Sequence, residues 1–330
     1  MKNIVYVSSA NSQQIEVWEL NPDSSLYLIQ ILKLKGEPQP ILISSDKKRL
    51  YVGIRPKFRI CSHIINSNGT LEEIGYSNIS FSVNHFSINE SETHLFSSSY
   101  HYNCINVSPI DSSGFIHPVI QTINEIKGCH SSLVYNKNVF VSSLKDNRIY
   151  LYNFTKEGIL VEHKKKFISF KKNCGPRHII FQKNMNRLFS INEIDGTLSI
   201  LNVSSLCNRI TFKKNIDIIP NKNQKPAWSS DIHISPCTKF LYASDRGNNS
   251  ITILKNHSDI NSIKILGYVQ TEVQPRSFDI SKNGKNLIVA GELSNSISVY
   301  DRNKVTGFLK LKNRYPTGNR PVWISIHEIS

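Results

Sequence analysis

Side chains that can bind an anion or transfer a proton recur along this 330-residue chain at intervals of about 45 residues. One group stands at the start of apolar segments: His85, Cys129-His130, Pro176-Arg177-His178, Asp231-Ile232-His233, Pro275-Arg276 and Arg320-Pro321. A second group stands in turns that follow apolar segments: Arg55, Tyr100, Lys145, Glu193, Asp245-Arg246 and Glu292. Guanidinium groups bind anions, and imidazole or carboxylate groups can accept a proton. Because cations outnumber carboxylates, the combined set suits a small anionic ligand.

A repeat in the sequence predicts the elements that carry these residues. β-Rich segments are centred on seven anchor residues: Tyr6, Tyr51, Phe96, Phe140, Phe189, Tyr242 and Ile288. Nine residues after each anchor stands an apolar residue of a second segment: Ile15, Ile60, Ile105, Ile149, Leu198, Ile251 and Ile297. A constant offset across seven units is the signature of a repeat architecture.

Turn-forming residues divide each repeat into four strands. Asp195-Gly196 and Gly247-Asn248-Asn249 lie between the two segments and favour hairpins. Another apolar segment precedes each anchor, and a further one follows a turn such as Asn68-Gly69. Four antiparallel strands every ~45 residues are typical of a β-propeller blade. We therefore predict an all-β, seven-bladed β-propeller that needs no helix.

The two ends of the chain predict how the ring closes. No room exists before Tyr6 for the first strand of its blade, whereas Pro321–His327 forms a first strand that no second strand follows. The C-terminal strand is therefore expected to complete the N-terminal blade and to remove the exposed edges. No linker divides the chain, so residues 1–330 are predicted to form a single domain. The glycine-histidine and Trp-Asp marks of WD repeats are absent.

Composition narrows the classes of partner and cofactor. The net charge is +15 and the isoelectric point about 9.5, but the charges are scattered, as the lysine- and asparagine-rich usage of an AT-rich genome would produce. No apolar run approaches the ~20 residues of a membrane span, and the start is too polar for a signal peptide. We therefore expect a cytoplasmic protein that binds neither membrane nor nucleic acid. The six cysteines form no C-x-x-C pair, which favours free thiols and no metal site.

Several of the repeated motifs resemble those of the bacterial propeller-type 6-phosphogluconolactonase family. They are Gly128-Cys129-His130-Ser131, Gly175-Pro176-Arg177-His178, Asn192-Glu193, Trp228 to Pro236, Gln274 to Phe278, and the segments around Val5-Tyr6-Val7, Leu50 to Pro56 and Gly318 to Trp323. The resemblance extends over the whole chain. Departures from the family pattern lie mostly on strand surfaces and outer turns, where Lys and Asn replace other residues. The family is related to fungal muconate-lactonising enzymes, whose site uses one His, one Glu and two Arg; His130, Glu193, Arg177 and Arg276 match them.

The resemblance implies hydrolysis of 6-phospho-D-glucono-1,5-lactone to 6-phosphogluconate, with no cofactor. In this hypothesis Glu193 or His130 is the general base, and either Arg177 or Arg276 stabilises the developing oxyanion. The other arginine would hold the phosphate with Arg55 or Arg320. The full set of substrate-binding candidates is Arg55, Tyr100, His178, Asp231, His233, Arg246 and Arg320.

Several candidates also have a purely structural interpretation. Asp231 and His233 alternate on one strand and could form a polar network that braces the inner strands. Arg177 and Arg276 could have the structural role of connecting neighbouring blades. Trp228 is expected to pack beneath the connection to the sixth blade rather than to contact substrate. The basic, aromatic run Lys164–Lys172 is predicted to be an exposed edge strand, where lysine opposes aggregation.

Two other functions compete with the lactonase. A muconate-type cycloisomerase, or a lactonase for a substrate without phosphate, could use the same constellation. A non-enzymatic propeller could bind protein or nucleic acid through its basic surface, with an affinity that falls steeply with salt. Fold alone does not separate these functions. The expected assembly is a monomer or a weak homo-oligomer.

Overall fold

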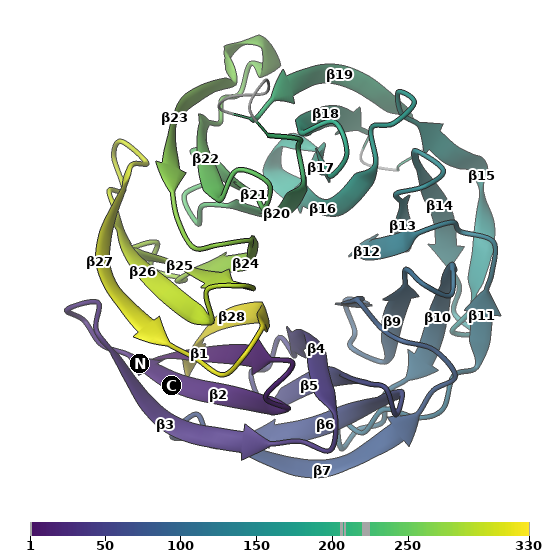
Figure 1. The fold of residues 1–330 in the computed structure, drawn as a ribbon. Helices are drawn as coiled ribbons and strands as arrows, with labels where there is room; N and C mark the ends of the chain where they lie inside the picture. The colour runs from purple at the N-terminus through teal and green to yellow at the C-terminus, as the bar shows by residue number, and fades with distance from the viewer. Residues whose placement is uncertain (1, 205–206, 208, 220–224, 330) are drawn as a thin grey trace.

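The computed structural model describes residues 2–204, 207, 209–219 and 225–329. These residues form seven four-stranded antiparallel sheets arranged as a ring (Figure 1), and residues from the innermost strands of several blades line cavities along its central channel. The predicted seven-bladed β-propeller is therefore confirmed; Met1 and Ser330, the ends of the predicted domain, lie outside the described residues. No helix in this part of the chain is long and apolar enough to cross a membrane.

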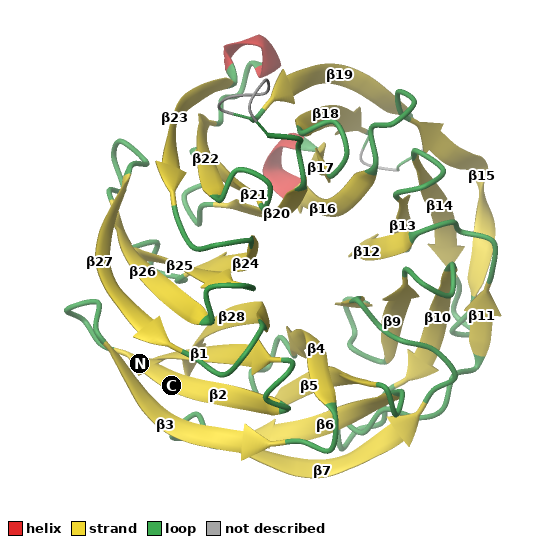
Figure 2. Cartoon of the chain, in the orientation of Figure 1, coloured by secondary structure: helices red, strands yellow, loops and turns green. Residues whose placement is uncertain are grey.

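In each blade the four strands lie side by side, in order from the innermost strand next to the channel to the outermost. Strands and loops make up nearly all of the ribbon in Figure 2. The first three blades comprise β28 (Pro321–Ile329), β1 (Lys2–Ser9), β2 (Gln14–Leu20) and β3 (Leu26–Lys33); β4 (Glu37–Ile43), β5 (Arg49–Arg55), β6 (Arg59–Ile65) and β7 (Leu71–Asn78); β8 (His85–Ile88), β9 (His94–Ser99), β10 (Cys104–Pro109) and β11 (Gln121–Ile123). The next two comprise β12 (Cys129–Tyr135), β13 (Asn138–Ser143), β14 (Arg148–Phe154) and β15 (Leu160–Ser169); β16 (Pro176–Gln182), β17 (Arg187–Asn192), β18 (Thr197–Val203) and β19 (Ile210–Asp217). The last two comprise β20 (Ser229–Ile234), β21 (Phe240–Asp245), β22 (Ser250–Lys255) and β23 (Lys264–Gln270); β24 (Pro275–Ile280), β25 (Asn286–Gly291), β26 (Ser296–Arg302) and β27 (Leu309–Pro316).

Helical structure within the described ranges is confined to two 3-10 turns, which the sequence did not predict. They are η1 (Lys183–Met185), between β16 and β17, and η2 (Ile260–Ser262), between β22 and β23. Each 3-10 turn is three residues long and lies in the connection between two strands, so the propeller topology is unchanged.

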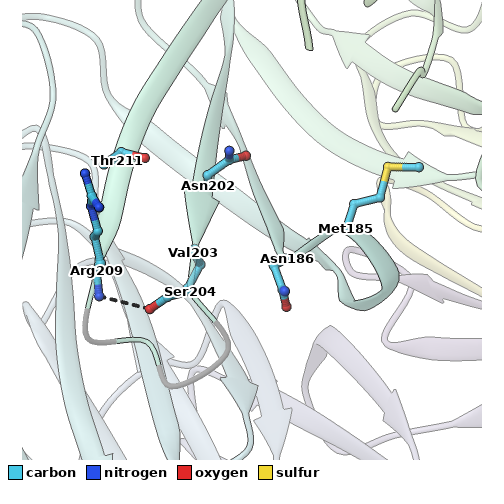
Figure 3. A pocket seen from close by; sticks show the side chains of 7 residues that line it. All are labelled: Met185, Asn186, Asn202, Val203, Ser204, Arg209 and Thr211. Carbon is cyan, nitrogen blue, oxygen red and sulfur yellow. Dashed lines mark hydrogen bonds between the residues drawn. The ribbon is translucent and has the colours of Figure 1, made fainter. Parts of the chain in front are cut away.

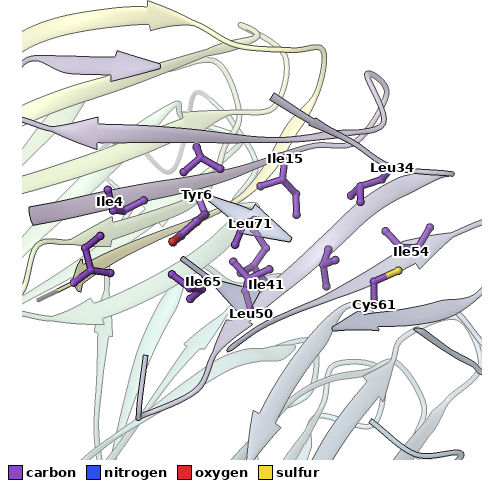
Figure 4. Packing of buried hydrophobic residues seen from close by; sticks show 13 residues of the cluster. Ile4, Tyr6, Ile15, Leu34, Ile41, Leu50, Ile54, Cys61, Ile65 and Leu71 are labelled. Carbon is purple, nitrogen blue, oxygen red and sulfur yellow. The ribbon is translucent and has the colours of Figure 1, made fainter. Parts of the chain in front are cut away.

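The repeated apolar residues form the contacts between blades. All seven anchors lie in the second strand of a blade, and all seven residues at the offset of nine lie in the third strand; none is more than 2 % exposed. In the cluster of Figure 4, Ile4, Tyr6 and Ile15 of the first blade pack against Ile41 and Leu50 of the second. The period of the sequence is thus the period of this packing.

Glycine turns connect the anchors of one blade to the next. The hydroxyl of Tyr6 donates to the carbonyl of Gly69 at 2.9 Å, and the hydroxyl of Tyr242 donates to the carbonyl of Gly307 at 2.7 Å. Both glycines have positive φ, and a Cβ at Gly69 would collide with the side chain of Ile4. Only glycine combines that backbone conformation with so close an approach.

The C-terminal strand closes the ring as predicted. β28 pairs with β1 from Lys2 opposite Ile329 to Ser9 opposite Pro321, and Figure 1 shows the two termini in the same blade. The predicted edge position of the lysine run is also confirmed, because β15 is the outermost strand of its blade and Lys164 and Lys166 are exposed. All six cysteines are free, and five of them are buried.

The innermost strands carry bulges where they reach one mouth of the channel. The register with the second strand shifts between Pro38 and Ile41, Cys129 and Ser131, Pro176 and Ile179, Ser229 and Ile232, and Pro275 and Ser277. The closing strand shifts opposite Ser8 and Ser9, whereas β8 pairs with β9 without a shift. A bulge leaves residues out of the ladder and re-aims their side chains. Five of the residues expected to do chemistry occupy these positions: His130, Arg177, His178, Asp231 and Arg276.

Removal of residues 321–330 is expected to unfold the protein. Val322, Ile324 and Ile329 are buried by 94 % or more, and each contributes about 1.5–3 kcal/mol, so their sum approaches the roughly 5–15 kcal/mol by which a domain is stable. The first blade would also lose the strand that pairs with β1. Thermal denaturation followed by circular dichroism measures the effect; an unaltered melting curve would contradict the closure, and partial recovery on adding a synthetic 321–329 peptide is the matching control.

Candidate active site

Eight of the eleven predicted site residues line one cavity of about 290 Å³ at a mouth of the channel. The cavity is lined by Gln39, Arg55, Asn84, Tyr100, His101, His130, Arg177, Glu193, Trp228, Arg246, Arg276 and Arg320. As expected, they come from the first residues of innermost strands and from the turns that follow second strands. Segments about 45 residues apart in the sequence therefore meet in this cavity.

Serine hydroxyls hold the bulged backbone that presents two of the arginines. The carbonyl of Arg177 accepts hydrogen bonds from Ser131 Oγ and Ser142 Oγ, both at 2.6 Å. The carbonyl of Arg276 accepts one from Ser230 Oγ at 2.6 Å. Each serine lies on the neighbouring blade, so the bonds satisfy carbonyls released from the ladder and fix adjacent inner strands to each other.

Glu193 holds two arginines with one carboxylate oxygen. Its Oε2 lies 2.9 Å from Arg177 Nε and 2.7 Å from Arg246 Nη2. Arg177 is 1 % exposed and also donates to the carbonyl of Ser230 at 2.5 Å. Burial, aided by Arg246, lowers the pKa of Arg177 to about 9, and burial lowers that of Arg246 to about 10. Both guanidiniums therefore remain cationic at neutral pH and are fixed in place.

The opposite part of the cavity has an excess of positive charge. Glu292 Oε1 accepts a hydrogen bond from Arg320 Nε at 2.9 Å, and its Oε2 lies 3.8 Å from Arg276 Nη1. Burial alone would raise the pKa of Glu292, but Arg276 and Arg320 outweigh it and lower that pKa.

Arg55 has no carboxylate within ion-pair distance among the described residues; it donates to the carbonyl of Val83 at 3.2 Å. Burial, then the charges of Arg276 and Arg320, lowers its pKa to about 10. Five guanidiniums therefore line the cavity, and two carboxylates pair with them: Glu193 in the lining and Glu292 beside it, which leaves an excess of three positive charges, counted as five minus two.

His130 is a buried, neutral imidazole beside these charges. It is 6 % exposed, and Asn84 fixes its backbone by donating from Nδ2 to the His130 carbonyl at 2.5 Å. The ring of Tyr100 contacts it with centroids 6.0 Å apart. Burial, followed by the charge of Arg177, holds the pKa of His130 well below its usual range. At neutral pH the ring therefore keeps a lone pair that can accept a proton.

The prediction that His178, Asp231 and His233 share this cavity requires correction. They line a second cavity of about 220 Å³, together with His85, Asp279 and Trp323. Arg177 and His178 are neighbours in the bulge of β16, which lets the first side chain enter one cavity and the second enter the other. The alternative prediction, a polar network between inner strands, agrees with the contacts.

That network is built on one buried carboxylate. Asp231 Oδ1 lies 2.8 Å from His178 Nδ1, its Oδ2 lies 3.3 Å from His233 Nε2, and His233 Nδ1 lies 3.6 Å from Asp279 Oδ1. Burial opposes the charge on His233, yet Asp231 and then Asp279 outweigh it and raise the pKa of His233 to about 9. No three or more His, Cys, Asp or Glu side chains of the described part of the chain are arranged to hold a metal ion.

Four residues of the first cavity were absent from the predicted site: Gln39, Asn84, His101 and Trp228. Asn84 and His101 are sequence neighbours of two identified positions, His85 and Tyr100, and this adjacency was the available signal. Trp228 was expected to pack beneath a connection. Instead it is 40 % exposed at the rim, and the guanidinium of Arg246 stacks over its ring at 4.0 Å.

Another surface cavity, of about 240 Å³, lies at the turns of the fifth blade (Figure 3). It is lined by Met185, Asn186, Asn202, Val203, Ser204, Arg209 and Thr211. The backbone N–H of Arg209 donates to Ser204 Oγ at 3.0 Å, as the dashed line shows. Among the described residues that line it, Arg209 is the one charged side chain, so this part of the cavity shows no cluster of charges like that of the channel mouth.

The Asp231 network predicts a stability that falls as pH rises. A group whose pKa is higher in the folded state stabilises fully below its unfolded value, here 6.5, and loses that contribution as pH rises through its folded value, here about 9. The difference in urea midpoint between wild type and His233→Gln should therefore be largest near pH 6 and shrink toward pH 9. One third of the His233 side chain is exposed, so solvent screening limits the size of the effect.

The matched control for this experiment is His117→Gln. His117 Nε2 also lies 3.0 Å from a carboxylate, Asp111, but both side chains are exposed. Its difference from wild type should be small throughout, because an exposed ion pair contributes little to stability. A constant difference for His233→Gln would contradict the assigned network.

Comparisons with known proteins agree with the fold and extend along the chain. The sequence profile of the family described as "Lactonase, 7-bladed beta-propeller" matches residues 4–326. A protein of Buchnera aphidicola subsp. Baizongia pistaciae named 6-phosphogluconolactonase is 50 % identical over 327 residues, 98 % of this chain and 99 % of its own length. One of the same name from Serratia proteamaculans is 38 % identical over 99 % of both chains.

Solved structures reproduce the same fold at low sequence identity. The periplasmic gluconolactonase of Pseudomonas aeruginosa superimposes with a TM-score of 0.94 at 18 % identity, over the whole of both chains. A protein of Bacteroides fragilis superimposes with a TM-score of 0.90 at 22 % identity, over 99 % of this chain and 98 % of its own. The profile match over nearly the entire sequence and the relative that is 50 % identical show that the chain belongs to the seven-bladed β-propeller lactonase family.

Proposed function

We propose that the protein is a 6-phosphogluconolactonase, a carboxylic ester hydrolase that opens 6-phospho-D-glucono-1,5-lactone to 6-phospho-D-gluconate in the oxidative pentose phosphate pathway. The observation that carries the proposal is the excess of three positive charges around a neutral imidazole in one cavity. A phosphate monoester carries up to two negative charges and the reacting carbonyl develops a third. Relatives of that name are up to 50 % identical over the whole chain.

His130 is the general base in this proposal, and Glu193 positions arginines. Two guanidinium groups already approach Glu193 Oε2, whereas the His130 ring is neutral and forms no ion pair with any residue that the structure describes. The low pKa of His130 makes it a weak base in the empty site. A bound phosphate offsets the arginine charges that help to lower that pKa, so substrate binding strengthens the base.

The two arginine roles divide according to burial and pairing. Arg177 is buried, doubly anchored, and the charged group with the largest effect on His130, so it is assigned to the developing oxyanion. Arg276 is only loosely paired at 3.8 Å, and Arg276 and Arg320 lie close enough to Arg55 for their charges, after burial, to lower its pKa. These three are assigned to the phosphate.

The reaction balances without a cofactor or metal. Water attacks the lactone carbonyl as His130 takes one of its protons, and the carbonyl oxygen becomes an oxyanion beside Arg177. Collapse of this intermediate breaks the bond to the ring oxygen, which receives the proton back from His130. The product acid then ionises, so each turnover releases one proton. A cytoplasmic location, a monomeric or weakly oligomeric state and the lack of nucleic-acid binding stay predictions from sequence.

The direct test is the disappearance of lactone generated in situ by glucose-6-phosphate dehydrogenase, with spontaneous hydrolysis subtracted. Wild type should accelerate hydrolysis, and Arg276→Ala should lose most of the acceleration. His130→Asn should lower kcat by ~10²-fold or more, the usual contribution of a general base. Folded wild type without acceleration would exclude the lactonase and leave a binding propeller as the surviving alternative.

Selectivity for phosphate tests the division of the arginines. Arg55→Gln and Arg320→Gln should each raise KM for the phosphorylated lactone while changing KM for glucono-1,5-lactone little, because only the former carries the phosphate. Lys145→Gln is the matched control, since Lys145 stacks on Tyr100 with its Nζ 5.0 Å from the ring centroid but does not line the cavity. Equal changes for both lactones would instead favour a substrate without phosphate, as in a muconate-type enzyme.

A further inference from the structure

Two buried ring nitrogens lack hydrogen-bond partners among the described residues and belong to neighbouring imidazoles. They are Nδ1 of His130 and Nε2 of His178. Both rings are at least 94 % buried, and their centroids lie 5.2 Å apart. An N–H···N hydrogen bond of about 2.9 Å between two five-membered rings would place their centroids about 5 Å apart. The observed centroid distance of 5.2 Å therefore matches that of a direct N–H···N contact between the two rings.

The state of His178 is set by the carboxylate behind it. Asp231 Oδ1 lies 2.8 Å from His178 Nδ1, and the backbone N–H of Ile232 donates to the same oxygen at 3.0 Å. The backbone N–H of Phe278 donates to Oδ2 at 3.3 Å. Because an ionised carboxylate only accepts hydrogen bonds, the proton of neutral His178 lies on Nδ1 and its Nε2 carries a lone pair.

We propose that Asp231 and His178 are positioning residues that fix the tautomer of His130. The lone pair of His178 Nε2 accepts the proton on His130 Nδ1, which leaves His130 Nε2 unprotonated for the water that attacks the lactone. No covalent bond changes in this arrangement, and His178 does not touch substrate. The inference rests on the proposed function, in which His130 is the base.

The proposed series of side chains, Asp231, His178 and His130, extends from the second cavity to the first. His130 lines the first cavity and His178 the second, and their contact forms part of the wall between them. Asp231 therefore acts on the active site from outside it. A carboxylate behind an imidazole stabilises the cation that forms when the base takes a proton, and here that effect is transmitted through a second imidazole.

Two substitutions at His178 separate this role from packing. In His178→Asn the amide can still donate to Asp231 but does not reach the position of Nε2. In His178→Gln the amide oxygen reaches that position and can accept from His130. His178→Asn should lower kcat by ~10²-fold with KM changed by less than about twofold, and His178→Gln should recover most of the loss.

The matched control is His85→Asn. The His85 ring packs on His178 at the same centroid distance of 5.2 Å, but its Nδ1 accepts from the backbone N–H of Ser132 at 3.5 Å, and among the described residues the histidines that contact the Asp231 carboxylate are His178 and His233. It should retain more than about half of the wild-type kcat. A loss as large as that of His178→Asn, or no rescue by His178→Gln, would overturn the proposal in favour of simple packing.

Nitrogen-15 NMR of ring-labelled protein provides a readout that needs no lactone. With the His130 signal assigned by its absence in His130→Gln, wild type should show a proton on Nδ1 and none on Nε2. His178→Asn should shift the population toward protonated Nε2. A wild-type His130 with its proton on Nε2, or a tautomer that His178→Asn leaves unchanged, would contradict the inference. If wild type shows no lactonase activity, the proposed function fails, while this spectrum still decides whether His178 orients His130.

Discussion

The pairing of β28 with β1 is the constraint on which the site depends. An open row of blades would leave an unpaired edge and could spread, so the innermost strands would have no fixed distance across the channel. Closure brings Arg276 close to Arg55, more than 200 residues away in the sequence, so that its charge, after burial, lowers the pKa of Arg55. The cavity is therefore a property of the ring as a whole, and no single blade contains it.

Within the closed ring, the main difficulty is to keep five guanidiniums close together. Glu193 and Glu292 each neutralise part of the charge of two arginines, and backbone carbonyls such as that of Ser230 accept further donors. What is left is a cavity that is positive yet rigid before any ligand arrives. Such preorganisation is the main way in which enzymes stabilise developing charge. Burial, aided by these positive charges, also accounts for the neutral state of His130.

The sequence predicted the blades and most of the charged residues that line the first cavity, because both follow the repeat. Tyr6, Tyr51 and their equivalents pack between blades at a fixed spacing, so their pattern reports the fold directly. His178, Asp231 and His233 were assigned to the wrong cavity because the bulges of β16 and β20 break the simple alternation of side chains. Trp228 follows a connection of irregular length, and repeat arithmetic could not show that its ring stacks under Arg246. Inference from the spacing of residues in the repeat therefore failed where the backbone departs from the regular pattern.

The unneutralised charge near Arg55 also bears on how a catalytic cycle would end. Opening a phosphorylated lactone converts a neutral ester into a carboxylate, so the product carries one more negative charge than the substrate. Under the proposed assignment, the same arginines would therefore bind the product more strongly than the substrate, most of all at low ionic strength. Arg276 and Arg320 have the solvent-accessible guanidiniums through which salt and water can compete. In such an enzyme the departure of the product, rather than ring opening, limits turnover once the chemistry is fast.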